Sequence, residues 1–335
     1  TFSAVEWRIG EVSDPLAPNY ESEVEQPYEV DAVWESGVLG VFANKQIVPS
    51  GVLRVGSSYR ARIRHQDSSG RWSHWSEPHS FIAGQPNVAP YLAGLVISEI
   101  MYHPEGNGDL EFIELMNVGP VVLALSPLRF IDGIEFDFST GRIDSLAPGE
   151  RVLLVRNLVA FEAAYGSALP VTGEYFSGGL SNGGELVVLS FGGDLPLREV
   201  NYDDSSPWPV AADGEGRSLV LIGPEGVPDH ADPLNWRSSV SNGGNPGQSD
   251  ALPYPGGDLL AYALAGGPVF DFEQLTLTVP LNPGADEVIV TPEWSSDLKT
   301  WHSTGFILSG REPEVWAVTV PGQRLFLRVK AASRR

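Results

Sequence analysis

The sequence predicts an all-β protein made of several β-sandwiches in tandem. Glycine (37 residues) and proline (27) are abundant, as in a chain with many turns, while 42 % of the residues are hydrophobic, which argues against disorder. Short apolar runs alternate with these turn residues, and no βαβ alternation of strands and helices is visible. A length of 335 residues is enough for two or three domains, each with its own core.

The bulk composition excludes several partners and several kinds of chemistry. Acidic residues outnumber basic ones 43 to 21, and the net charge of −22 repels nucleic acid and anionic membranes. No apolar run reaches the ~20 residues that span a bilayer, so membrane insertion is not expected. The chain has no cysteine, which excludes disulfides, thiolate zinc sites and cysteine nucleophiles.

Residues 1–84 are predicted to form the first domain. In YRARIR (59–64) apolar and aromatic residues alternate with arginines, which is the period of a half-buried strand, and WSHWS (72–76) follows after a DSSG turn. This pair resembles the last two strands of a fibronectin type III domain with a WSxWS motif. The resemblance implies a cation–π ladder between the arginines and Trp72 and Trp75, whose role would be to stiffen the sheet.

Two alternatives accompany this first domain. Trp72 and Trp75 could instead form an aromatic platform for carbohydrate or another partner, since stacked indole faces also suit sugars. The segment before Val5 is short for a complete sandwich, which predicts a domain that is incomplete at its N-terminus and a sheet edge open to strand addition.

A Pro- and Gly-containing linker is predicted at 85–94, followed by a second domain at 95–247. The strand-like segments LVISEIMYHP, EFIELMNVG, RVLLV, ELVVLSF and SLVLI lead to the terminal loop SNGGNPG. This series resembles the lamin tail domain, an immunoglobulin-like sandwich found in nuclear lamins and in large bacterial secreted or surface proteins. The resemblance implies a scaffold or interaction module without catalytic residues. Only 158–166 has helical periodicity.

A second linker is predicted at 248–258, and a C-terminal β-sandwich at 259–335. The segments WSSDLKTW and RLFLRVKA resemble the short β-domain that ends many large secreted proteins of verrucomicrobia and planctomycetes. The whole chain is therefore predicted to be tandem immunoglobulin-like and fibronectin III-like sandwiches, forming a processed or excised C-terminal portion of an extracellular or cell-surface bacterial protein.

One candidate metal site stands out in the second domain, which carries −15 of the net charge. Asn107, Asp109 and Glu111 place oxygen ligands at i, i+2 and i+4 in a loop, and such spacing suits calcium. Asp203, Asp204 and Asp213 in later loops are further candidates. The alternative is an acidic turn without a metal, because no twelve-residue EF-hand loop is present.

Two further patterns were considered for catalysis. Ser181 lies in GLSNG, which matches the G-x-S-x-G nucleophile elbow, but an apolar strand-like run follows it where the elbow needs a helix, so a turn is predicted. Glu99, Glu111 and Glu114 should lie on adjacent strands. They are predicted to be framework acids that accept hydrogen bonds, with a catalytic dyad as the alternative.

These observations favour a non-catalytic structural or interaction region: a scaffold, a spacer or an adhesion module. Its partners would be other proteins, or further copies of itself through sheet edges. The alternative is an accessory region of a secreted enzyme whose catalytic domain lies upstream, with polysaccharide bound by one of the tryptophans at 72, 75, 208 or 236. No cofactor is expected apart from the candidate calcium.

Overall fold

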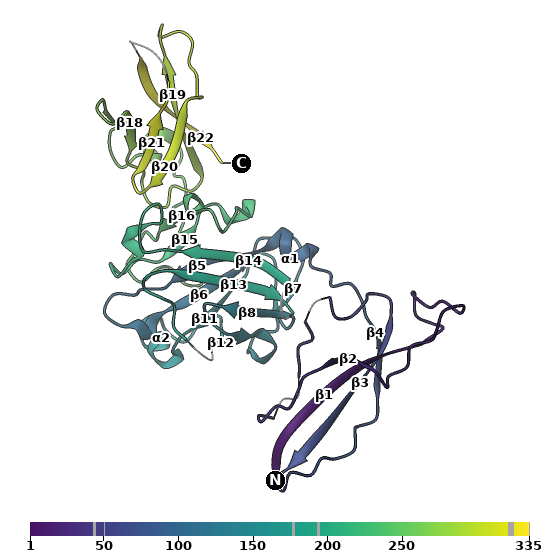
Figure 1. Cartoon of the computed structure of the whole chain (residues 1–335). Coiled ribbons are helices and arrows are strands. Elements are labelled where there is room, and N and C mark those ends of the chain that lie inside the picture. Colours follow the sequence, from purple (N-terminus) through teal and green to yellow (C-terminus); the bar gives the residue numbers. More distant parts are fainter. Residues whose placement is uncertain (43–44, 50, 176–177, 193–194, 321–324, 335) are drawn as a thin grey trace. The chain divides into compact units, whose positions relative to one another are not determined.

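The structure is a computed structural model that describes residues 1–42, 45–49, 51–175, 178–192, 195–320 and 325–334. The predicted all-β class is confirmed, with 38 % strand, 11 % helix and several sheets. The chain forms two units, Thr1–Val88 and a second that comprises Ala89–Phe191 and Pro196–Arg335 (Figure 1). The division falls inside the predicted linker 85–94, whereas the predicted linker 248–258 lies within the second unit.

The first unit contains one antiparallel sheet with the strand order β2-β1-β3-β4. Its strands are β1 (Phe2–Val12), β2 (Ala32–Glu35), β3 (Ser58–Asp67) and β4 (His79–Ile82). The long pair β1–β3 forms the centre of the sheet, and Val5, Ile9 and Tyr59 are buried on it. The predicted alternation of 59–64 is therefore a strand, but 72–76 is not, because only an isolated bridge joins Gln66 to Trp72.

The larger sheet of the second unit has six strands in the order β12-β11-β6-β5-β15-β16. Their bounds are Val171–Glu174, Arg151–Val155, Phe112–Asn117, Leu95–Met101, Leu219–Leu221 and Trp236–Ser238. Every residue of β5 and β6 is buried, so these two central strands are covered on both faces. The polar residues of β5 and β6 therefore need partners inside the protein.

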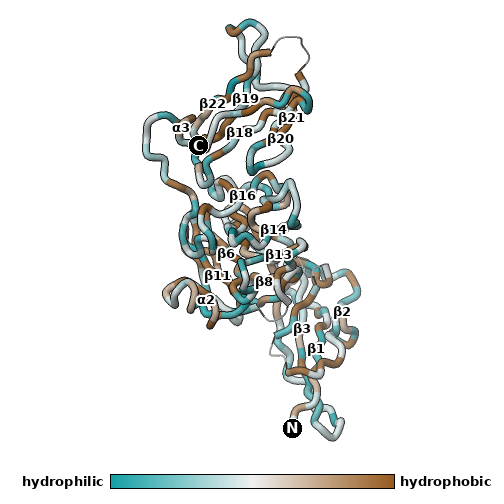
Figure 2. Tube along the Cα trace, turned by 90° about the vertical axis from the view of Figure 1, so that its left-hand side faces the viewer, coloured by the Kyte–Doolittle hydropathy of each residue, from teal (hydrophilic) through white to brown (hydrophobic). Residues whose placement is uncertain are grey.

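A four-stranded sheet, β14-β13-β8-β9, and a short pair, β10-β7, accompany the six-stranded sheet. Their bounds are Leu195–Tyr202, Glu185–Phe191, Leu128–Asp132 and Phe136–Asp137 for the former, and Ser145–Leu146 and Leu123–Ala124 for the latter. Hydrophobic segments run along the strands and hydrophilic segments along many of the loops, as Figure 2 shows. This is the distribution expected of packed sheets joined by exposed turns.

Helices are short throughout the described residues. The predicted helix at 158–166 is confirmed as α2 (Leu158–Tyr165), whose Asn157 side chain caps Ala160 N–H. Two others are α1 (Ala89–Gly94), which occupies half of the predicted linker, and α3 (Leu259–Ala263). The 3₁₀ turns are η1 (Gly108–Leu110), η2 (Phe138–Thr140), η3 (Val210–Ala212), η4 (Pro224–Gly226) and η5 (Pro233–Asn235). No described helix has the length and apolar character needed to cross a membrane.

The C-terminal part of the second unit contains the sheet β17-β18-β21-β20 and the pair β19-β22. The bounds are Val269–Asp271, Thr276–Val279, Glu314–Val318 and Phe306–Arg311 for the sheet, and Val288–Ser295 and Phe326–Ser333 for the pair. Leu277, Val279, Val288, Val290 and Val318 form a small core between them. This part thus has its own apolar centre, as a sandwich requires.

Candidate functional site

The predicted cation–π ladder is present in the first unit, with different members than expected. The Arg64 guanidinium lies 4.6 Å from the ring centre of Trp72 and 4.5 Å from that of Trp75, so it contacts both indoles. Arg8 of β1 lies 5.5 Å from Trp75. Contacts of this kind contribute about 0.5–2 kcal/mol each, depending on how far water is excluded.

The other arginines of β3 do not take part in the ladder. Arg62 donates to Glu29 at 2.6 Å and Arg60 lies 3.8 Å from the same carboxylate. The hydrogen bond from Arg62 lowers the pKa of Glu29, against a smaller opposing effect of burial. The expectation that all three arginines interleave with tryptophans is therefore wrong, because a carboxylate from the loop before β2 competes for two of them.

The serines of the WSHWS segment tie it to β3. The hydroxyl of Ser73 accepts a hydrogen bond from His65 N–H at 3.1 Å, and that of Ser76 accepts one from Ile63 N–H at 3.2 Å. Their own N–H groups donate to the His65 and Ile63 carbonyls at 2.8 Å. Hydroxyls thus replace carbonyls as acceptors, and the segment follows β3 without becoming a strand.

In the second unit, two carboxyl groups lie side by side in the buried strands, since Glu99 of β5 pairs in register with Glu114 of β6. Glu99 is 2 % exposed and Glu114 1 %. Burial, with a smaller effect of the Glu114 charge, raises the pKa of Glu99 to about 8. Burial also raises the pKa of Glu114, against the opposing hydrogen bond from Ser98 and charge of Arg151.

Both carboxyl groups hold the terminal loop SNGGNPG (241–247). Glu99 Oε1 accepts hydrogen bonds from Ser218 Oγ at 2.5 Å and from Asn245 N–H at 2.9 Å. Glu114 Oε2 accepts one from Gly247 N–H at 2.6 Å. The predicted framework role of these acids agrees with this geometry. Gly244 has a φ of +73°, and a methyl group there would overlap Glu99 Oε1, so the loop requires glycine at that position.

The residues of the candidate calcium site do not converge in the structure. Asn107 caps η1 by accepting a hydrogen bond from Asp109 N–H at 3.1 Å. Glu111 is 2 % exposed, pairs with Arg156, and accepts hydrogen bonds from Tyr175 Oη and Leu180 N–H at 2.7 Å each. Within the described ranges, no group of three or more acidic or histidine side chains is arranged to hold a metal ion.

The later acidic loops and Ser181 also have assigned partners. Asp213 lies 2.6 Å from His103 Nδ1, and Asp203 accepts a hydrogen bond from Ser205 N–H at 2.9 Å. Ser181 lies in a turn before β13, and its N–H donates to Glu185 Oε1 at 2.7 Å. A strand follows this serine, so the strand-to-helix geometry of a nucleophile elbow is not present around it.

The predicted carbohydrate platforms differ in accessibility. Trp72 and Trp75 are half-buried at the surface of the first unit. Trp208 is 6 % exposed and Trp236 is fully buried, with ring centres 6.2 Å apart. The suggestion that Trp208 or Trp236 binds polysaccharide is therefore wrong, because both rings belong to the core of the second unit.

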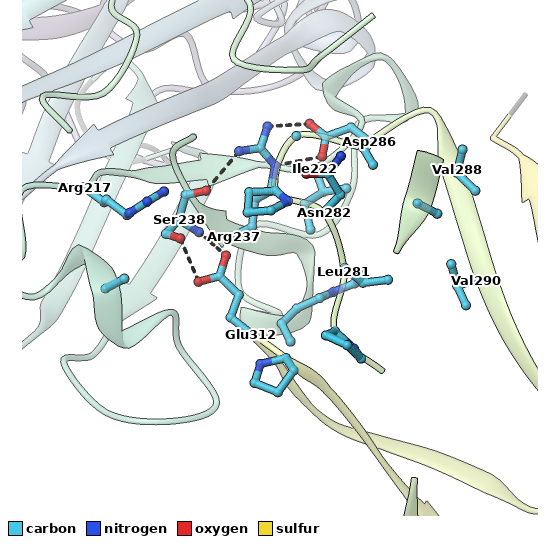
Figure 3. Close-up of a pocket in the computed structure, with 18 of the residues that line it drawn as sticks. Arg217, Ile222, Arg237, Ser238, Leu281, Asn282, Asp286, Val288, Val290 and Glu312 are labelled. Carbon is cyan, nitrogen blue, oxygen red and sulfur yellow. Dashed lines mark hydrogen bonds and ion pairs between the residues drawn. The ribbon is translucent and has the colours of Figure 1, made fainter. Parts of the chain in front are cut away.

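A buried arginine joins the six-stranded sheet to the C-terminal sheets within the second unit. Arg237 of β16 donates from Nε and Nη2 to the two oxygens of Asp286 at 2.7 Å each (Figure 3). It also pairs with Asp250. Burial would lower the pKa of Arg237, but the hydrogen bonds and charges of the two carboxylates raise it above its usual value. A bidentate pair of this kind fixes both distance and orientation.

Further hydrogen bonds strengthen the same junction. Ser238 N–H and Oγ donate to the two oxygens of Glu312 at 2.6 and 2.7 Å (Figure 3). Arg311 donates to the Leu234 carbonyl at 2.8 Å. We call the set Arg237, Asp250, Asp286, Ser238 and Glu312 the junction tie.

A cavity of about 350 Å³ adjoins the junction tie. The apolar part of its lining comes from both sides of the junction and includes Ile222, Leu281, Val288 and Val290 (Figure 3). This size and mixed lining are typical of small-molecule sites in proteins.

Sequence reasoning did not find the junction tie. Asp250 lies in the stretch predicted as the linker 248–258, where it is 8 % exposed and also accepts hydrogen bonds from Val240 N–H. The one local signal was Arg237, a charged residue between Trp236 and Ser238 in what is a short buried strand. A charge in such a position requires a buried partner.

The second unit is thus defined as an all-β assembly of sheets joined by buried ion pairs. No family model matches the chain, and no curated protein sequence matches it. Among solved structures it is similar to a DUF4876 family protein from Bacteroides thetaiotaomicron VPI-5482, at 12 % identity over 66 % of this chain and 83 % of that one. The TM-score is 0.28, and a similarity of this size carries no information on function.

Proposed function

We propose that this chain is a non-catalytic structural and interaction region of a bacterial extracellular or cell-surface protein, acting as a spacer or scaffold. The single observation that supports this role best is the junction tie. The stretch 248–258 would act as a hinge without these contacts. Its Asp250 pairs with Arg237 and accepts a hydrogen bond from Val240 N–H, and both contacts hold the stretch against β16. A spacer needs such coupling because a flexible joint would not keep a fixed distance between its ends.

The lamin-tail-like pattern of 95–247 and the fibronectin III-like ladder of the first unit fit this proposal. The ladder adds stiffness to a sheet with few buried residues, and the acids Glu99 and Glu114 are engaged in holding a loop. Partners would be other proteins or further copies of the chain.

Pulling the full-length chain in an optical trap tests the coupling. We expect the second unit to unfold in one step, since its two parts share buried ion pairs. Arg237→Leu leaves Asp250 and Asp286 without their partner, which costs about 3–5 kcal/mol, and should split this event into two. Arg54→Leu is the matched control, because Arg54 pairs with Glu11 at the exposed surface of the first unit. Two separate events in the unchanged chain would contradict a stiff spacer.

A second candidate function is polysaccharide binding by the first unit as an accessory region. A specific observation favours it: Trp72 lines an open surface groove together with Phe2, Phe42 and His65. The Phe42 and His65 rings lie nearly parallel, with their centres 6.0 Å apart. Aromatic faces of this kind suit pyranose rings.

Pull-down with insoluble polysaccharides distinguishes the two functions. The control is Trp301→Ala, because Trp301 lies in the C-terminal part of the second unit, where its ring contacts Arg328. Retention of the chain that is lost in Trp72→Ala and kept in Trp301→Ala would favour the accessory role. No retention by any polysaccharide would leave the structural role as the better proposal.

A further inference from the structure

The cavity beside the junction tie is lined by more basic than acidic side chains, although the chain as a whole is acidic. Four arginines line it, against the carboxylates of Asp286 and Glu312. They are Arg217, Arg237, Arg311 and Arg334. Since the chain has only 21 basic residues and 43 acidic ones, a gathering of four arginines around one cavity is not expected from composition.

Two of these arginines are neutralised and two are not. Arg237 has Asp250 and Asp286, and Arg311 pairs with Glu314 at 2.5 Å. The other two, Arg217 and Arg334, donate their hydrogen bonds to backbone carbonyls.

Arg217 donates to the carbonyls of Ser239 and Val240, the latter at 3.0 Å, and Arg334 donates to the carbonyl of Asp286 at 2.9 Å. Within the part of the chain that the structure describes, neither guanidinium has a carboxylate within ion-pair distance.

The environment of Arg334 is unfavourable for its charge. Burial lowers its pKa, and the nearby charge of Arg311 lowers it further, against weaker opposing effects of Asp286 and Glu314. A half-buried guanidinium that lacks a carboxylate retains most of its desolvation cost. A bound anion would remove that cost.

Apart from Ser238 and Asn282, the remaining lining of the cavity is made of apolar and small residues. Ala263, Val288 and Val290 reach it from the C-terminal core, and Ile222 from the end of β15. An inorganic anion would leave this surface in contact with water, whereas a ligand with a hydrocarbon part would cover it.

We propose that the cavity binds a small aliphatic carboxylate. Its carboxylate neutralises Arg334, and its hydrocarbon chain lies against Ile222, Val288 and Val290. The site adds ligand binding to the structural role and does not depend on it. Because both sides of the junction contribute to the lining, a bound ligand also stabilises their association.

Calorimetric titration of the chain with sodium octanoate tests this proposal. The control compounds are 1-octanol, which has the hydrocarbon chain without the carboxylate, and sodium acetate, which has the carboxylate without the long chain. Octanoate should bind and raise the thermal midpoint, and each control compound should do so much more weakly. Arg334→Gln should weaken octanoate binding at least about tenfold, since it removes the charged hydrogen-bond donors to the carboxylate. Arg334→Lys, which keeps the charge, should recover part of the loss.

Arg142→Gln is the matched control, because Arg142 is exposed and does not line the cavity. Methyl NMR of the unchanged protein gives a second readout that does not depend on the folding of any variant, with octanoate shifting the resonances of Val288 and Val290. Equal binding of octanoate and octanol would overturn the proposal, as would unaltered affinity in Arg334→Gln. Unshifted methyl resonances at millimolar octanoate would also overturn it.

Discussion

Replacing Glu99 with glutamine should change how the stability of the second unit depends on pH. Glu99 lies in a strand that is buried on both faces, beside Glu114. Its pKa is raised from 4.5 to about 8, chiefly by burial. Glutamine retains the oxygen that accepts hydrogen bonds from Ser218 and Asn245 and cannot ionise.

The size of the effect follows from proton linkage. The unfolded chain loses the Glu99 proton near pH 4.5, whereas the folded protein keeps it to about pH 8. Folding therefore takes up a proton in this window. The contribution of Glu99 to stability is fully present below pH 4.5 and falls as pH rises toward 8, by about 1.4 kcal/mol per pH unit. Between about pH 5.5 and 7.5 this amounts to about 2–3 kcal/mol.

Urea unfolding at a series of pH values, followed by the fluorescence of the buried Trp208 and Trp236, measures this difference. The free energy of unfolding of the unchanged protein should fall relative to that of Glu99→Gln as pH rises, so that the variant gains about 2–3 kcal/mol over the window. Glu162→Gln, at an exposed position of α2, is the control and should follow the unchanged protein. Parallel pH profiles for Glu99→Gln and the unchanged protein would refute the reasoning.

Three further predictions concern other parts of the chain. Gly244→Ala should destabilise the second unit by at least about 2 kcal/mol, because it combines a positive φ with an overlap on the Glu99 carboxylate, whereas Gly226→Ala has open space and should change little. Arg64→Ala should lower the stability of the first unit by about 2 kcal/mol by removing two cation–π contacts together with the ion pair to Glu6, and an unaltered urea midpoint would show that the ladder is not stabilising. Because the residues of the loop 107–111 do not converge, EDTA should leave the thermal midpoint unaltered, and a lowered midpoint would instead support the calcium hypothesis.

Much of the fold could be predicted because local patterns decide it. The alternation in 59–64, the apolar runs that became β5, β6 and β13, and the periodicity of α2 each depend on residues close in sequence. The pairing of Glu99 with Glu114 also followed from two consecutive strands joined by one loop. In these cases the residues that determine the structure lie close to one another in the sequence.

The parts that could not be predicted depend on distant residues. Arg237 pairs with Asp286, which lies on the far side of a stretch that was predicted to be a linker. Arg62 of β3 pairs with Glu29, which lies in the loop before β2. Neither pair has a spacing that a single sequence reveals. The sequence also did not show that Trp208 and Trp236 are buried. Tryptophan occurs both in protein cores and on sugar-binding surfaces, so the residue type alone does not distinguish the two.

The hydroxyl contacts of Ser73 and Ser76 have a consequence for self-association. Together with β4, the WSHWS segment covers one edge of β3, and serine hydroxyls take the place of backbone carbonyls as the acceptors of the β3 N–H groups. A segment held in this way does not present a regular ladder of backbone groups on its far side, so another strand cannot be added to it in register. The motif therefore acts as edge protection. A chain polymerising through its sheets would have to use a different strand from β3.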